Sequence, residues 1–341
     1  MALSSIARGA AARIGLKPAP ISVGFEITHL CNLECRYCDR HTPGPHQMTR
    51  EQILDALGGL HALGMRHVSL DGGEPLTHRH IDEVAAFLAQ RGVRIYMNTN
   101  GVLVPRKVAT VRLLSKVKIS LDGPPACHDA MRGEGSWQKA INGAIVARHA
   151  GVGVELTCVV GQHNESHIEE LVEFADTHRF RIVFQPARNS LFLDNTRDGS
   201  GFQLEAAELR RVFARLRELK LAGSPSIANG WASLRHFLDF PQDVSLPCAA
   251  GWINATLDPE GNLFHCGQVD RNDLTHNVVR LGARRAFEGL VRKGCTQCWC
   301  ARVVEENYAW GGRFHRMLPP RSVHAPPAPP SPPSRRLPVV A

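Results

Sequence analysis

The 341-residue chain lacks the long apolar runs that anchor or export a protein. No stretch approaches the roughly 18 consecutive apolar residues of a membrane-spanning helix. Near the start, Arg8 and Arg13 interrupt the apolar residues too early to leave a signal-peptide core. These absences argue against a membrane-spanning or secreted protein, and we expect a cytoplasmic one.

Acidic side chains are missing from both ends of the chain. Residues 1–20 and residues 318–341 each hold three basic and no acidic side chains, so only +2 of the net charge of +8 belongs to the body. A nucleic-acid-binding surface needs a basic stripe on the folded body, so no nucleic-acid partner is expected. Residues 1–20 are interpreted as an N-terminal extension. Residues 318–341, which hold nine of the 22 prolines, are predicted to form a disordered tail.

A fourth cysteine is missing where three others cluster. Cys31, Cys35 and Cys38 form a C-x3-C-x2-C motif, and in a reducing compartment clustered cysteines indicate metal binding or catalysis before disulfides. Tetrahedral zinc needs four ligands, which His29 or His41 beside the loop would complete, so zinc stays an alternative. A [4Fe–4S] cluster held by three cysteines explains the count better, because it leaves one iron open.

Hydrophobic periodicity predicts an α/β fold. Apolar runs at 21–28, 67–72, 94–100, 116–123, 153–160 and 181–186 indicate buried strands, separated by amphipathic helices, the first of which is capped by Thr49. Six such units predict a partial (βα)6 TIM-like barrel over residues 21–190, with the loops after the strands on one rim. Residues 191–245 are predicted to be a helical connector. Residues 246–317, with a hairpin turn at 258–262, are predicted to be a small α+β domain.

Polar motifs follow the predicted strands. The second strand ends in Gly72-Gly73-Glu74-Pro75, the third in Asn98-Thr99-Asn100-Gly101 and the fourth in Ser120-Leu121-Asp122-Gly123. With the cysteine motif, these resemble the radical S-adenosylmethionine (SAM) superfamily over about residues 21–190. The resemblance implies an enzyme that reductively cleaves SAM to a 5′-deoxyadenosyl radical, which abstracts hydrogen from a substrate C–H bond.

The resemblance also implies roles for individual residues. Cys31, Cys35 and Cys38 match the ligands of the SAM-binding cluster. The implied SAM contacts are Tyr37 near the adenine, Gly72, Gly73 and Glu74 near the amine, Ser120 and Asp122 near the carboxylate and ribose, and Asn98 and Asn100 on the rim. Arg132 matches a stretch after the fourth strand, where it neutralises a carboxylate or forms a structural salt bridge.

A second cysteine group lies near the C-terminus. Cys248, Gly261 and Cys266 have the spacing C-x12-G-x4-C, and Cys295, Cys298 and Cys300 follow. This resembles the auxiliary-cluster domain of SPASM and twitch radical SAM enzymes, although the longer SPASM cysteine series is incomplete here. It implies one auxiliary [4Fe–4S] cluster held by Cys248, Cys266, Cys295 and Cys298, with Cys300 as an alternative ligand. Zinc remains an alternative for this group too.

Several assignments stay open. Cys127 is a candidate hydrogen-atom donor on the rim or a packing residue, and Cys158 is expected in the core. Gln185, Arg188 and Asn189 end the last barrel strand and are candidate substrate contacts. The substrate is a peptide, a small polar molecule, or a tetrapyrrole or lipid, and the expected electron donor is of the flavodoxin or ferredoxin type. A zinc or iron–sulfur scaffold is the non-enzymatic alternative.

Overall fold

The computed structural model describes residues 18–38, 46–187, 201–239, 246, 248–267, 271, 273–290 and 298–320. Its centre is an eight-stranded sheet with the order β6-β5-β4-β3-β2-β1-β7-β8, in which neighbouring strands from β6 to β7 are parallel. The strands are β1 (Ser22–Thr28), β2 (His67–Gly72), β3 (Arg94–Thr99), β4 (Lys116–Ser120), β5 (Gly153–Val160), β6 (Arg181–Pro186), β7 (Asn254–Leu257) and β8 (Leu263–Phe264). The six predicted barrel strands are therefore confirmed.

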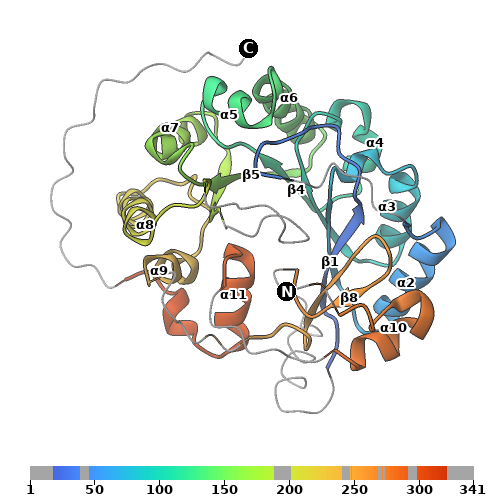
Figure 1. Ribbon diagram of the computed structural model, residues 1–341. Helices are drawn as coiled ribbons and strands as arrows, with labels where there is room; N and C mark the ends of the chain where they lie inside the picture. Colours follow the sequence, from blue (N-terminus) through green and yellow to red (C-terminus); the bar gives the residue numbers. More distant parts are fainter. Residues whose placement is uncertain are drawn as a thin grey trace.

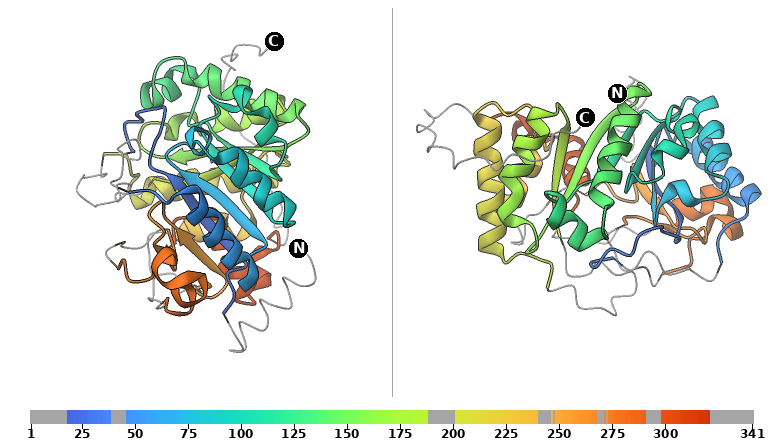
Figure 2. Two further views of the ribbon diagram at one scale, coloured as in Figure 1. Left: turned by 90° about the vertical axis from the view of Figure 1, so that its right-hand side faces the viewer. Right: turned by 90° about the horizontal axis from the view of Figure 1, so that it is seen from above.

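The helices mostly lie on the outside of this sheet, as Figure 1 and Figure 2 show, whereas the helix at Ala301–Trp310 lies across its open side. They are α2 (Arg50–Leu63), α3 (Ile81–Gln90), α4 (Val108–Val111), α5 (Pro125–Arg132), α6 (Ser136–His149), α7 (Ile168–Thr177), α8 (Ala206–Leu221), α9 (Trp231–Asp239), α10 (Val278–Glu288) and α11 (Ala301–Trp310). Thr49 caps α2 as predicted, since its side chain accepts from the backbone of Gln52 while the Gln52 side chain accepts from the backbone N–H of Thr49. Among the described helices, none is both long and apolar enough to cross a bilayer.

The predicted C-terminal hairpin forms, and it joins the barrel sheet. β7 and β8 are antiparallel, and the turn between them contains Gly261, whose φ of +88° favours glycine. β7 also pairs in parallel with β1, from Ser22 opposite Asn254 to Phe25 opposite Leu257. The sheet therefore continues without a break from the barrel into the C-terminal part of the chain.

The open side of the barrel lies between two edges. At one edge, residues 226–230 run alongside β6 and pair with it. The backbone N–H of Ile182 donates to the carbonyl of Ser226, and the carbonyl of Ile182 accepts from the backbone N–H of Ala228, both over 2.8 Å. The β7–β8 hairpin forms the other edge. Figure 1 shows α11 between this hairpin and α9.

Side chains of α11 contact both edges. Glu305 accepts from the backbone N–H of Ser233 in α9 over 2.7 Å. Glu306 accepts from the side chain of Asn254 in β7 over 3.3 Å, and Arg302 donates to Ser22 in β1 over 3.3 Å. The helix therefore closes the barrel interior.

Candidate active site

The loop that holds Cys31 is fixed by the end of β2. The backbone N–H of Gly73 donates to the carbonyl of Thr28, and that of Glu74 donates to the carbonyl of Leu30, both over 2.8 Å. A Cβ at Gly73 would lie 2.1 Å from the Leu30 oxygen, closer than any real contact. Two glycines are therefore needed at the end of β2, because its backbone is in direct contact with the backbone segment that leads into Cys31.

The Glu74 side chain organises the ends of β2 and β3. It is fully buried and accepts from Thr99 Oγ1 over 2.7 Å, from the backbone N–H of Asn100 over 2.8 Å and from that of Leu76 over 3.1 Å. Burial raises its pKa to about 6 against the lowering effect of these donors, so the carboxylate stays ionised at neutral pH. In turn, Asn100 donates to Asn32 over 2.8 Å and lies 4.0 Å from the sulfur of Cys31.

A buried network connects Tyr37 to Asp122 and Arg132. The Tyr37 hydroxyl donates to Asp122 Oδ2 over 2.8 Å, and Arg132 Nε donates to the same oxygen over 2.6 Å. The other oxygen, Oδ1, accepts from the backbone N–H of Val159 over 3.1 Å. Burial favours the neutral acid, but Arg132, His128 and the hydrogen bonds outweigh it and lower the pKa of Asp122 to about 2. Asp122 is therefore a fixed negative charge that orients Tyr37.

The three N-terminal thiols lie close enough together to influence one another. Burial raises the pKa of the Cys35 thiol to about 11; Cys38 and Cys31 also raise it, whereas Arg132 lowers it. The backbone N–H of Cys38 donates to the carbonyl of Cys35 over 3.0 Å, which turns the loop back on itself. Three soft thiol ligands on one short loop fit the donor set of an iron–sulfur cluster.

The second cysteine group also converges. Burial raises the pKa of the Cys298 thiol, and the charges of Cys300, Cys266 and Cys248 raise it further, so each of these three thiols lies within electrostatic range of Cys298. Cys300 is the N-cap of α11, and the Cys298 carbonyl lies 2.8 Å from the Nε2 of His236 in α9. Cys295 lies outside the described residues. Among those described, no three histidine, cysteine or carboxylate side chains lie at the spacing of a single metal ion.

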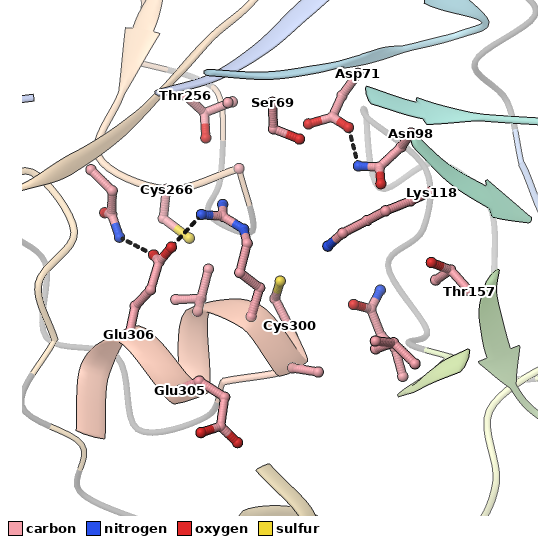
Figure 3. Close-up of a pocket in the computed structure, with 18 of the residues that line it drawn as sticks. Ser69, Asp71, Asn98, Lys118, Thr157, Thr256, Cys266, Cys300, Glu305 and Glu306 are labelled. Atoms are coloured by element: carbon pink, nitrogen blue, oxygen red, sulfur yellow. Dashed lines mark hydrogen bonds and ion pairs between the residues drawn. The ribbon is translucent and has the colours of Figure 1, made fainter. Parts of the chain in front are cut away.

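A cavity of about 570 Å³ occupies the barrel interior. Its lining includes Gly72 at the end of β2, and Figure 3 shows Cys266 and Cys300 on the wall that faces Lys118. The predicted contacts Asn98, Ser120 and Gln185 also line it. The cavity therefore extends from the expected SAM stretch to the second cysteine group.

Five strands contribute one polar layer to this cavity, which we call the polar belt: Glu26, Asp71, Asn98, Lys118 and Glu155. Glu26 lies opposite Asp71 in the sheet register, and Lys118 lies opposite both Asn98 and Glu155. The side chain of Asn98 in β3 donates to Asp71 in β2, so each member of the belt has its neighbour on the adjacent strand. Barrel interiors of this type are usually packed with branched apolar side chains, so a charged layer indicates a binding cavity.

Glu26, Asp71, Lys118 and Glu155 were not predicted as site residues, although the sequence carries a signal for them. A fully buried parallel strand is normally apolar on both faces. In residues 116–120, Lys116, Lys118 and Ser120 alternate with buried apolar residues, and the neighbouring strands carry polar residues at the matching positions. Period-two polarity shared by successive strands predicts a polar interior.

The remaining predicted residues fall in different places. The Cys127 thiol donates to the carbonyl of His163 over 3.3 Å, and burial raises its pKa to about 11. Cys127 is not among the residues that line the cavity. Cys158 is fully buried in the core, as predicted. Arg188 and Asn189 lie outside the described residues.

Comparisons with known proteins give consistent matches. A sequence profile of the radical SAM superfamily matches residues 25–175. The mycofactocin maturase MftC of Mycobacterium ulcerans is 30% identical over 264 residues, covering 73% of this chain and 68% of the relative.

Solved structures show the same fold. SuiB of Streptococcus suis bound to S-adenosylmethionine matches with a TM-score of 0.65 at 17% identity, covering 80% of this chain and 66% of that one. SuiB bound to its precursor peptide SuiA matches with a TM-score of 0.60 at 16% identity, covering 91% and 70%. Native anSMEcpe with bound AdoMet matches with a TM-score of 0.62 at 17% identity, covering 80% and 81%. The chain thus spans slightly under two thirds of the length of the SAM-bound SuiB chain.

Proposed function

Because the chain belongs to the radical SAM superfamily, we propose that it is an enzyme that modifies an unreactive C–H bond of a substrate held in the barrel cavity. The observation that carries this proposal is the cavity itself, which reaches from Gly72 to Cys266 and Cys300. Its volume of about 570 Å³ lies within the range of small-molecule sites. A substrate here lies between the two cysteine groups.

Cys31, Cys35 and Cys38 would hold the SAM-binding [4Fe–4S] cluster, which supplies the electron that splits SAM into methionine and a 5′-deoxyadenosyl radical. The chain's own task is to position and enclose the reactants, since a radical of this kind has little selectivity of its own. The Gly72–Gly73 backbone leaves room for close approach, and Asp122 holds Tyr37 in a single orientation. With α11 across the barrel opening, the reacting carbon is kept from bulk water.

The C-terminal cysteines would hold an auxiliary cluster. The electrostatic influence of Cys248, Cys266 and Cys300 on Cys298 supports this assignment, and Cys295 is the further candidate from the sequence. Because Cys266 and Cys300 line the cavity, such a cluster would face the substrate. That position suits a group that passes electrons during an oxidation or shapes the substrate pocket.

A peptide substrate is the second candidate. The same fold holds a precursor peptide in SuiB, and a cavity of this size accommodates the side chains or terminus of a peptide. The polar belt disfavours a lipid, because an apolar ligand leaves buried charges without solvation. A small polar molecule and a peptide segment both fit the polar lining.

Anaerobic reconstitution tests the proposal. We expect about eight iron atoms per chain and, on reduction, conversion of SAM to 5′-deoxyadenosine. Cys35→Ala should abolish this cleavage. Cys266→Ala should retain it while impairing substrate turnover. Cys158→Ala is the control, because it removes a core thiol that neither cluster uses and should leave the iron content unchanged. Equal cleavage by the wild type and Cys35→Ala, or stoichiometric zinc in place of iron, would refute the proposal.

A further inference from the structure

Several charges that face the cavity are paired with a close partner of opposite sign, while the carboxylates of Asp71 and Glu305 accept hydrogen bonds from Asn98 and from the backbone N–H of Ser233. Arg271 makes two hydrogen bonds of 2.6 Å to the two oxygens of Glu26. On α11, Arg302 pairs with Glu306 over 2.6 Å. Such short, paired contacts satisfy charges that are largely removed from water.

Lys118 is different. Its closest carboxylate oxygen is Glu155 Oε1 at 3.7 Å, while the other oxygen of Glu155 is taken by Lys116 at 2.9 Å. Two ammonium groups thus share one carboxylate. Within the described ranges, no other carboxylate lies within ion-pair distance of Lys118. Lys116, Lys118 and Glu155 together carry one positive charge in excess.

The Lys118 ammonium is directed into the cavity. Its side chain is only 20% exposed, and Figure 3 shows it extending from β4 into the middle of the cavity, toward the wall that carries Cys300. Asp71, the next acid of the belt beyond Asn98, accepts a hydrogen bond from Asn98. A confined cation of this kind is stabilised by a bound anion.

We propose that Lys118 is an anion subsite of the cavity and that the substrate carries a carboxylate that binds there. This inference rests on the proposed function only in taking the cavity as the substrate site. Ser120 lies two residues further along the same face of β4, about 7 Å closer to the rim. A carboxylate at Lys118 therefore anchors the substrate deep in the barrel and leaves its next few atoms at the level of the expected SAM contacts.

Lys116 offers a matched control. It belongs to the same strand, faces the same side and contacts the same glutamate, but it does not line the cavity. Replacing either lysine by methionine removes one positive charge and retains an unbranched side chain. Lys118→Met removes the cation expected to contact the ligand, whereas Lys116→Met leaves that cation in place, so the first substitution should weaken anion binding more than the second.

The test measures binding by reconstituted, SAM-loaded but unreduced protein, so no turnover is involved. Three acids are compared by calorimetry or ligand-observed NMR with their neutral amides: glutarate for a free acid, N-acetylglycine for a peptide C-terminus, and N-acetylaspartate N-methylamide for an acidic side chain. A charge-assisted contact predicts that at least one acid binds about tenfold or more tightly than its amide. The preferred acid identifies the source of the carboxylate.

Lys118→Met should remove this preference, and Lys118→Arg should retain at least part of it. Lys116→Met should weaken it by less than Lys118→Met does, because the Lys118 ammonium stays in the cavity although Glu155 is then free to pair with it. If Lys118→Met does not fold, Lys118→Gln replaces it. The inference is wrong if no acid binds more tightly than its amide, or if the preference survives in Lys118→Met. Wild-type SAM cleavage, measured separately on reduction, reports on the proposed function and not on this subsite.

Discussion

The guanidinium of Arg132 and the carboxylate of Asp122 form an ion pair of 2.6 Å that is almost closed to solvent, with side-chain exposures of 9% and 0%. Arg132 ends α5, Asp122 follows β4, and the Tyr37 hydroxyl from the cysteine loop donates to the same carboxylate. The backbone N–H of Arg36 also donates to the carbonyl of Met131 over 2.9 Å. The pair therefore connects the cysteine loop to the barrel.

Arg132→Met should lower the free energy of unfolding by about 3–5 kcal/mol, because it leaves the Asp122 carboxylate buried without its counter-ion. Urea unfolding of the metal-free protein measures this effect apart from cluster binding. Arg215→Met is the control, since Arg215 pairs with Glu169 over 2.8 Å on an exposed surface and should cost less than about 1 kcal/mol. Similar losses in the two variants would contradict the role of the buried pair.

Asp122 also predicts an acid-sensitive stability. Its pKa is about 2 in the folded protein, against an ordinary value of 3.8. Because the folded value is the lower one, the unfolded chain takes up this proton first as the pH falls. The contribution of about 2 kcal/mol is complete above about pH 4 and is lost as the pH falls toward 2. Subtracting the pH–stability curve of Asp122→Asn from that of the wild type isolates it, and a flat difference over this interval would count against it.

Much of the fold was predictable from local pattern. The strands at 67–72, 153–160 and 181–186 match the structure residue for residue, because β-branched runs between turn residues are a short-range signal. The pairing of β7 with β1 was not predictable in this way. Ser22 and Asn254 meet across 232 positions, and neither stretch carries a local feature that selects the other as its partner.

The candidate site, too, was predictable from the sequence only in part. Cys31, Cys35 and Cys38, together with Gly72 and Gly73, were found because their spacing is a motif within one loop. Lys118 was missed because its role depends on Lys116 and Glu155. The two lysines share the Glu155 carboxylate only once β4 and β5 are in register. A charge excess of this kind follows from neighbours in space, which the sequence specifies only through the completed sheet.

Gly73→Ala should impair iron binding more than stability. The new Cβ would meet the Leu30 oxygen at 2.1 Å and force apart the backbones that position Cys31. We expect the iron content after reconstitution to fall by about half, as the N-terminal cluster fails to assemble. The effect is measured by iron and sulfide analysis with the cluster absorbance.

Gly58→Ala is the matched control for this substitution. A Cβ there would lie 3.6 Å from Phe87, an ordinary contact, on the helix α2. Alanine in a helix should stabilise the protein by about 0.5–1 kcal/mol and leave the iron content unchanged. Full iron loading of Gly73→Ala would show that the loop tolerates the displacement.

A chain that ends at residue 245 should not fold as an independent barrel. It loses β7, so the backbone groups of β1 that pair with Asn254–Leu257 have no partner, and it loses α11, which closes the barrel opening. An unpaired strand at the edge of a sheet promotes association with other chains, and the buried Val23 and Phe25 lie on this strand. We expect the fragment to aggregate in size-exclusion chromatography and to lack a cooperative thermal transition. A chain ending at residue 320 retains β7 and α11 and should melt like the full protein. A monomeric, cooperatively melting 1–245 fragment would show that the barrel is stable without the C-terminal hairpin, and that the two parts are separate folding units.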